Sequence, residues 1–262
     1  MSPALDAVLR RDRVIVGAGL GGLVLLAWLY LLRLGKGMAE METHAAMGMA
    51  MPQMHAWAMA DLGLLFVMWA VMMVAMMVPS AAPMIMLVAA VDRRRPDRPR
   101  PVARTGIFVL GYLTAWVVYS VLASSAQWGL HAAALLSPAM VSTSAYLGGA
   151  ILIAAGIYQW TPLKRTCLTS CRSPMAFLMS EWRDGPAGAW VMGLRHGLYC
   201  VGCCWVLMAL LFVAGVMNLA WVALIAAFVL GEKVVPGGHR VGQVAGFALL
   251  AAGVVLIARA GG

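Results

Sequence analysis

Long apolar segments alternate with short polar or basic segments along the chain of 262 residues. The apolar segments cover approximately residues 14–32, 57–78, 105–126, 141–160, 192–213, 219–230 and 241–257. About 20 apolar residues in a helix cross the roughly 30 Å of hydrocarbon in a bilayer. Backbone polar groups in lipid must bond within the segment, so these segments should be helices. The pattern predicts an all-α polytopic transmembrane helical bundle of about seven spans, or six if the short segment 219–230 does not cross.

Two apolar segments need comment. The first, 14–32, is too long for the apolar part of a cleaved signal, and no small-x-small cleavage site follows it, so we expect it to be retained. The second continues to about residue 91 and contains Pro79 and Pro83. Proline removes a backbone donor and clashes with the preceding turn, so these two should kink or split the helix. We expect residues 1–262 to form a single integral membrane domain.

Basic residues are concentrated in alternate polar segments. The chain carries 19 Lys and Arg against 10 Asp and Glu, but charged residues make up 11% of it, compared with about 25% in a soluble domain. Cytoplasmic loops are enriched in Lys and Arg. Segments 92–104 and 161–190 are therefore predicted to be basic cytoplasmic loops, with the N-terminus also cytoplasmic, in the inner membrane of a bacterium. The lipid bilayer, and not nucleic acid, is the expected partner of these charges.

Methionine is concentrated in the first third of the chain. Fourteen of the 21 methionines lie between Met38 and Met86, and segment 33–56, predicted to be an extracytoplasmic loop, adds His44 and His55. Thioether sulfur is a soft ligand that selects Cu(I). In the second apolar segment, helical spacing places four methionines on one stripe: Met72, Met73, Met76 and Met77. Methionine is also an adaptable packing residue, so simple packing is the alternative for this stripe.

A second group of soft ligands follows from the 161–190 segment into the next apolar segment: Cys167, Cys171, His196, Cys200, Cys203 and Cys204. His196, Cys200 and either Cys203 or Cys204 are separated by three or four residues and so share one face of a helix. Gly197 and Gly202 leave room for the segment that carries the other two cysteines. Thiolate and imidazole suit Zn(II), Cu(I) or an iron–sulfur cluster. The alternatives are buried small residues or a thiol redox pair, although cytoplasmic cysteines are normally reduced.

Three runs of the sequence carry distinctive motifs: WAVMMVAMMVPSAAP at 69–83, YQWTPLKRTCLTSCRSP at 158–174 and GLRHGLYCVGCCWVLM at 193–208. With GVMN at 215–218 and EK at 232–233, they resemble a bacterial family of uncharacterised, predicted metal-binding integral membrane proteins, over roughly residues 57–258. The resemblance implies a multi-helix membrane protein with a metal site. By position, its motif residues are Met72, Met73, Met76, Met77, Pro79, Pro83, Cys167, Cys171, His196, Cys200, Cys203, Cys204, Asn218 and Glu232. It implies no particular metal, substrate or mechanism.

Together these features favour a membrane protein that binds a soft transition metal, with copper ahead of zinc or an iron–sulfur cluster. We expect methionines and the two loop histidines to capture Cu(I) outside and the cysteines with His196 to hold it at the cytoplasmic helix entrance, for transport or delivery to a cuproprotein partner. One alternative is a structural or assembly subunit of a larger membrane complex. Another is a membrane thiol oxidoreductase. A conventional soluble-type enzyme is not expected, since the sequence has no phosphate loop, dinucleotide fingerprint, HExxH helix or nucleophile elbow.

Overall fold

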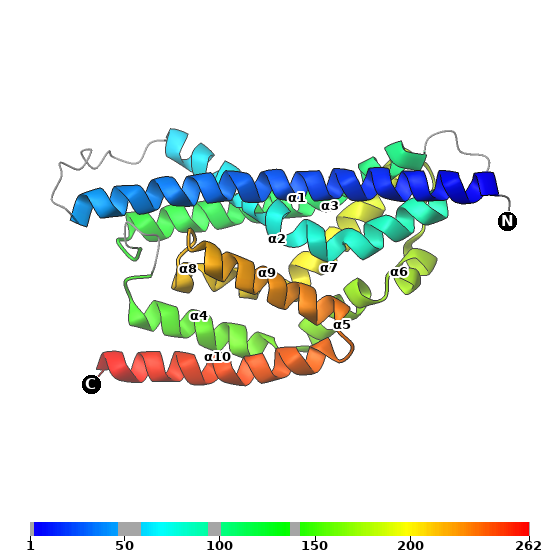
Figure 1. Cartoon of the computed structure of the whole chain (residues 1–262). Coiled ribbons are helices and arrows are strands. Elements are labelled where there is room, and N and C mark those ends of the chain that lie inside the picture. The colour runs from blue at the N-terminus through cyan, green and yellow to red at the C-terminus, as the bar shows by residue number, and fades with distance from the viewer. Residues whose placement is uncertain (1–2, 47–58, 94–100, 137–141, 262) are drawn as a thin grey trace.

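The computed structural model describes residues 3–46, 59–93, 101–136 and 142–261 (Figure 1). Within these ranges the regular structure is helical, apart from an isolated bridge between Leu136 and Ser142. The helices are α1 (Pro3–Ala46), α2 (Met59–Arg93), α3 (Pro101–Ala132), α4 (Ala145–Tyr158), α5 (Pro162–Arg172), α6 (Pro174–Glu181), α7 (Gly185–Ala209), α8 (Leu211–Ala214), α9 (Leu219–Val234) and α10 (Gly238–Gly261). The all-α prediction is confirmed for the described part of the chain.

In the part of the chain that the structure describes, five helical segments are long and apolar enough to cross a membrane: Val14–Met38, Met59–Arg93, Val102–Ala132, Gly185–Ala214 and Gly238–Gly261. The other two predicted spans correspond to α4 and α9, which have 14 and 16 residues. At 1.5 Å per residue these helices are about 21 and 24 Å long, short of the roughly 30 Å that a full span covers. The count of seven spans therefore stays a prediction.

Helix boundaries differ from the sequence prediction at two places. Residues 33–46 were expected in a loop, but α1 continues to Ala46, since this segment is rich in the good helix formers Ala, Met, Glu, Leu and Lys. Segment 161–190 is also mainly helical. Within it, Thr161 caps α5 by accepting a hydrogen bond from the backbone N–H of Lys164 at 3.3 Å, and Pro162 occupies the first turn.

α2 runs as one helix through both prolines. Side chains supply donors to its backbone just before the first proline: Ser80 Oγ donates to the carbonyl oxygen of Met77 at 2.9 Å, and Tyr112 of α3 donates to the same oxygen at 3.0 Å. A proline frees the carbonyl four residues earlier, here those of Ala75 and Pro79, so these two donors add hydrogen bonds at Met77 and do not replace the bonds that the prolines remove. The expected split of this helix does not occur.

The helices pack in two groups that meet around α7 and α9. α3 lies against both α2 and α7, and α1 runs along the outside of α2 (Figure 1). α4 and α10 pair along their length, on the other side of α7 and α9. At Gly197 on α7, a Cβ atom would lie 2.7 Å from Ala115 and 2.8 Å from the Tyr112 carbonyl oxygen, so this glycine allows α3 to come close.

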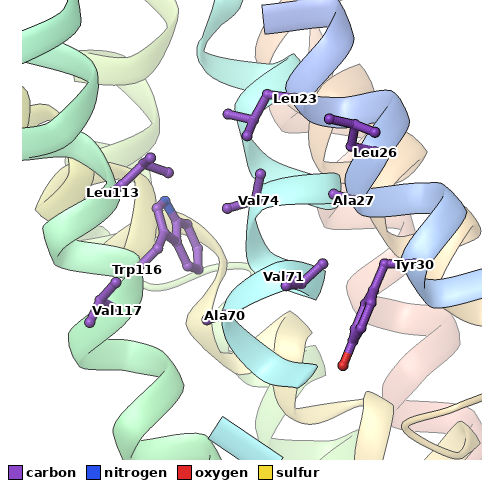
Figure 2. Close-up of a pocket in the computed structure, with 10 residues that line it drawn as sticks. All are labelled: Leu23, Leu26, Ala27, Tyr30, Ala70, Val71, Val74, Leu113, Trp116 and Val117. Atoms are coloured by element: carbon purple, nitrogen blue, oxygen red, sulfur yellow. The ribbon is translucent and has the colours of Figure 1, made fainter. Parts of the chain in front are cut away.

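An apolar pocket of about 380 Å³ lies between α1, α2 and α3, and Figure 2 shows the ten residues that line it. They are Leu23, Leu26, Ala27, Tyr30, Ala70, Val71, Val74, Leu113, Trp116 and Val117. None of these side chains is a sulfur, imidazole or carboxylate ligand. The pocket is therefore not a metal site, and the soft ligands lie elsewhere, in the core between α2, α5, α7 and α9.

Candidate metal centre

The methionine stripe of α2 and the cysteine cluster of α7 meet in the core. The thioether sulfur of Met77 lies 4.0 Å from the sulfur of Cys204, and both side chains are fully buried. Met77 lies near the end of the predicted span 57–78, away from the methionine and histidine loop that was predicted to face outward, and which side of the membrane each group faces stays a prediction. α7 begins at Gly185 and not near residue 192, so Cys200 lies about 22 Å along the helix rather than at its entrance.

The sulfur of Cys200 is contacted by polar side chains of other helices. Lys233 of α9 donates to its sulfur at 2.8 Å, and the Tyr112 hydroxyl lies 3.2 Å from the same atom. A lysine ammonium has three donors and no acceptor, so the sulfur accepts. Lys233 also donates to the Ser80 hydroxyl at 2.8 Å, which ties α9 to α2 at this point. Residues of α9 and α3 thus contact this sulfur of α7, and α2 is joined to the group through Lys233.

The neighbouring cysteines turn toward Cys200. Cys203 and Cys204 donate to its carbonyl oxygen at 3.1 and 3.0 Å. This is the local bonding of a polar side chain to the carbonyl three or four residues earlier in a helix. The thiol of Cys171, on α5, lies within hydrogen-bonding range of the Cys200 and Cys203 side chains. Four of the five predicted cysteines therefore gather within one small volume.

Cys167 lies one turn before Cys171 and packs against α7 at Gly202. A Cβ atom added at Gly202 would lie 2.6 Å from the Cys167 sulfur, so the glycine leaves the room that the sequence predicted. Burial, with the nearby Cys203, raises the pKa of the Cys167 thiol above its ordinary value. Hydrogen bonding to Cys200 is the main cause that raises the pKa of Cys171 well above its ordinary value. All five cysteines are free thiols in the structure.

His196 lies on the same face of α7 but in aromatic surroundings. Its ring centroid is 5.3 Å from that of Phe177, 5.8 Å from Tyr112 and 6.2 Å from Phe108. Its Nδ1 atom is buried without a hydrogen-bond partner among the described residues. The ring packs as part of an aromatic cluster, and its predicted role as a ligand stays a prediction. This cluster lies beside the sulfur centre, the name used below for the sulfur side chains of Met77, Cys171, Cys200, Cys203 and Cys204.

The remaining predicted ligands divide into two sets. Met72, Met73 and Met76 are buried in the same core cluster as the cysteines. His44 lies near the end of α1, in a part whose side chains are not described, and His55 lies outside the described residues altogether. Of the stripe, Met77 lies 4.0 Å from a cysteine sulfur, and ligation by the other methionines and by the two loop histidines stays a prediction.

Within the described ranges, no three His, Cys, Asp or Glu side chains form a group that could hold one metal ion. Cu(I) differs from zinc in accepting thioether as well as thiolate sulfur. Two sulfurs about 2.3 Å from a shared ion with trigonal geometry lie about 4 Å apart. The 4.0 Å between the Met77 and Cys204 sulfurs equals that separation, which is also that of an ordinary sulfur contact, and the soft donors are of the kind that Cu(I) accepts.

A polar cluster borders the sulfur centre at the end of α9. Glu232, adjacent to Lys233 in sequence, pairs with Lys164 of α5 at 2.8 Å, and both side chains are buried. Lys164 also donates to Gln159, and Arg172 donates to the backbone carbonyls of Glu232 and of Val235, the latter at 2.8 Å. Burial outweighs the attraction of Lys164 and raises the pKa of Glu232. This cluster fixes α5 against α9.

The sequence analysis did not identify Tyr112, Ser80 or Lys233 as parts of the site. Lys233 and Glu232 are adjacent in the sequence, but their side chains have different partners. One sequence signal was available, since a lysine within an apolar helix needs a partner away from lipid. Ser80 and Tyr112 carried no such signal.

A family model described as PpoB2, copper chaperone, matches residues 66–256. Because the match covers well over half of the 262 residues, the chain belongs to this family. No curated protein and no solved structure gives a significant match. The family is consistent with the resemblance to metal-related membrane proteins, and it connects the protein to copper.

Proposed function

From membership in this copper-chaperone family, we propose that the protein is a membrane copper chaperone that binds Cu(I) in the core between α2 and α7 and passes it to another protein. The observation that carries the proposal is the 4.0 Å approach of the Met77 thioether to the Cys204 thiol, beside Cys200. Binding through soft sulfur ligands in an apolar core excludes hard cations.

The methionines of α2 suggest how copper reaches this centre. Met68, Met72 and Met76 follow one another every four residues, as do Met73 and Met77, and all five are buried. Successive members of such a row are about 6 Å apart along the helix axis. We propose that weakly binding thioethers form a path along α2, and that the cysteines of α7 hold the ion more tightly at its end.

The proposed setting is the inner membrane of a bacterium, with the N-terminus in the cytoplasm. The basic segments at 92–104 and 161–190 support this orientation through the positive-inside rule. Reporter fusions to residues of these two segments test it. Active cytoplasmic reporters at both are expected, and an extracytoplasmic signal at either would reverse the orientation.

Copper quantification on purified protein tests the binding proposal. The wild-type chain in detergent is incubated with Cu(I) without oxygen, washed, and its copper per chain is measured. The double variant Cys200→Ser/Cys204→Ser should lose bound copper while keeping its helical content. Met179→Leu is the matched control, because Met179 is 81% exposed on α6 and should bind copper as the wild type does. Equal copper in the wild type and the double variant would contradict the proposed site.

Delivery is tested separately from binding. Copper-loaded protein is mixed with an apo acceptor that carries a two-cysteine Cu(I) site, and copper is followed on both after separation. For a chaperone, copper should reach the acceptor faster than the loaded protein releases Cu(I) to a competing chelator. Transfer no faster than release would indicate storage and not delivery.

A further inference from the structure

We infer that Lys233 makes the sulfur centre selective for a monovalent metal ion, by placing one fixed positive charge beside it. The inference rests on the proposed copper site and assigns a specificity-determining role to a residue outside the ligand set. The observation is direct: the ammonium of Lys233 lies 2.8 Å from the Cys200 sulfur, and its side chain is 7% exposed.

The charge of Lys233 is not cancelled by a neighbouring carboxylate. Glu232, the adjacent residue, directs its carboxylate to Lys164 of α5, with oxygens 2.8 and 2.9 Å from the Lys164 nitrogen. The second partner of Lys233 is the neutral Ser80 hydroxyl at 2.8 Å. One positive charge therefore remains next to the cysteines, in a core where Coulomb interactions are strong.

Counting charges shows which ion this arrangement favours. Cysteines bind metals as thiolates, so Cys200 and Cys204 contribute two negative charges to a complex, while the Met77 thioether contributes none. With Cu(I) and Lys233 the buried group is neutral. With Zn(II) the same group carries one uncompensated positive charge, and burying a net charge is costly. Lys233 thus favours Cu(I) over a divalent ion that also accepts thiolates.

Removing the charge should reverse this preference. In Lys233→Met, which keeps the length of the side chain, the Cu(I) complex becomes negative and the Zn(II) complex neutral. The two complexes differ by one unit charge, so the ratio of Cu(I) affinity to Zn(II) affinity should fall by about tenfold, which is on the order of the effect of one unit charge at this distance. A purely structural role for Lys233 would lower both affinities together, so their ratio distinguishes the two roles.

The experiment measures Cu(I) and Zn(II) dissociation constants of purified protein in detergent, by competition with a chelator for each metal. Wild type, Lys233→Met, the charge-preserving Lys233→Arg and the control Arg165→Met are compared, since Arg165 is exposed on α5. The Cu(I)-to-Zn(II) affinity ratio should fall by about tenfold in Lys233→Met alone. An unchanged ratio in folded Lys233→Met would overturn the inference while leaving the copper site intact.

A second variant covers the case in which Lys233→Met does not fold. Ser80→Asp places a carboxylate at the other partner of Lys233 and neutralises its charge without removing it, so the ratio should fall in the same direction. An unchanged ratio in this variant would also overturn the inference. If the wild type binds no Cu(I) at all, the proposed function itself fails.

Discussion

Two buried lysines occupy contrasting surroundings within the same part of the fold. Lys164 of α5 is paired with the Glu232 carboxylate, and Lys233 of α9 with the Cys200 sulfur. The first pair is a closed cluster of matched charges, completed by Gln159 and Arg172. The second is a charge beside soft, polarisable ligands that can accept a metal ion. The difference separates a structural role from a functional role for the same residue type.

Adjacent residues of one helix produce this division. Glu232 and Lys233 are consecutive and project about 100° apart around α9, so that one contacts α5 while the other reaches α2 and α7. The polar cluster of Glu232 and Lys164 is expected to govern stability, and the sulfur centre is expected to govern copper binding. Four substitutions test that separation.

The largest effect on stability is expected in the polar cluster of Glu232 and Lys164. Glu232→Leu leaves Lys164 buried without its partner, which should cost about 3–5 kcal/mol of stability. Replacing both members, as Lys164→Met/Glu232→Leu, should recover most of the loss, because an apolar pair of similar volume is often as stable as a buried ion pair. Unfolding midpoints in detergent measure both. A double variant no more stable than Glu232→Leu would contradict the pairing.

Close packing beside the sulfur centre should give the next effect. In Gly202→Ala, the added methyl group would lie 2.6 Å from the Cys167 sulfur, so α5 and α7 must move apart, at a cost of about 1–3 kcal/mol. Gly63→Ala on α2 is the matched control, because nothing lies within 4 Å of its Cβ position and alanine favours helix. Thermal unfolding of the two variants should change in opposite directions.

Met77 should affect copper more than stability. Met77→Leu preserves volume and should change stability by less than about 1.5 kcal/mol. It removes a thioether 4.0 Å from Cys204, so we expect Cu(I) affinity to fall about tenfold, or about 1.4 kcal/mol. Met84→Leu, at a similarly buried position of α2, should leave affinity unchanged. Equal affinities in both variants would remove Met77 from the site.

The smallest effect is expected at Tyr112. Tyr112→Phe removes a hydroxyl that contacts both the Met77 carbonyl and the Cys200 sulfur. The carbonyl keeps Ser80 as a donor, so the loss should be about 0.5–1.5 kcal/mol, as for one net hydrogen bond. Unfolding and Cu(I) titration of this variant check that the hydroxyl supports the site without holding the metal. Complete loss of copper binding would assign Tyr112 a direct role.

The sequence by itself determined the helical class, the apolar segments and the soft ligands, because these follow from hydrophobic length and residue chemistry. It also indicated, through the spacing of Cys200, Cys203 and Cys204 and through Gly202, that another segment would approach α7 there. Local chemistry accounts for these successes, since helical periodicity and side-chain volume act within a few residues. Such signals carry no information about which distant helices touch.

Only the tertiary structure decided that Met77 meets Cys204, and that Lys233 faces Cys200 while Glu232 faces Lys164. Hydropathy and charge describe segments singly, so they predicted the sides of the membrane for the methionine and histidine loop and for the cysteines, but not that the end of the methionine stripe contacts the cysteines. The contacts depend on the relative depth and rotation of α2, α7 and α9, which packing between helices sets. The sequence therefore supplies the ligands of the candidate copper site, and helix packing brings them together.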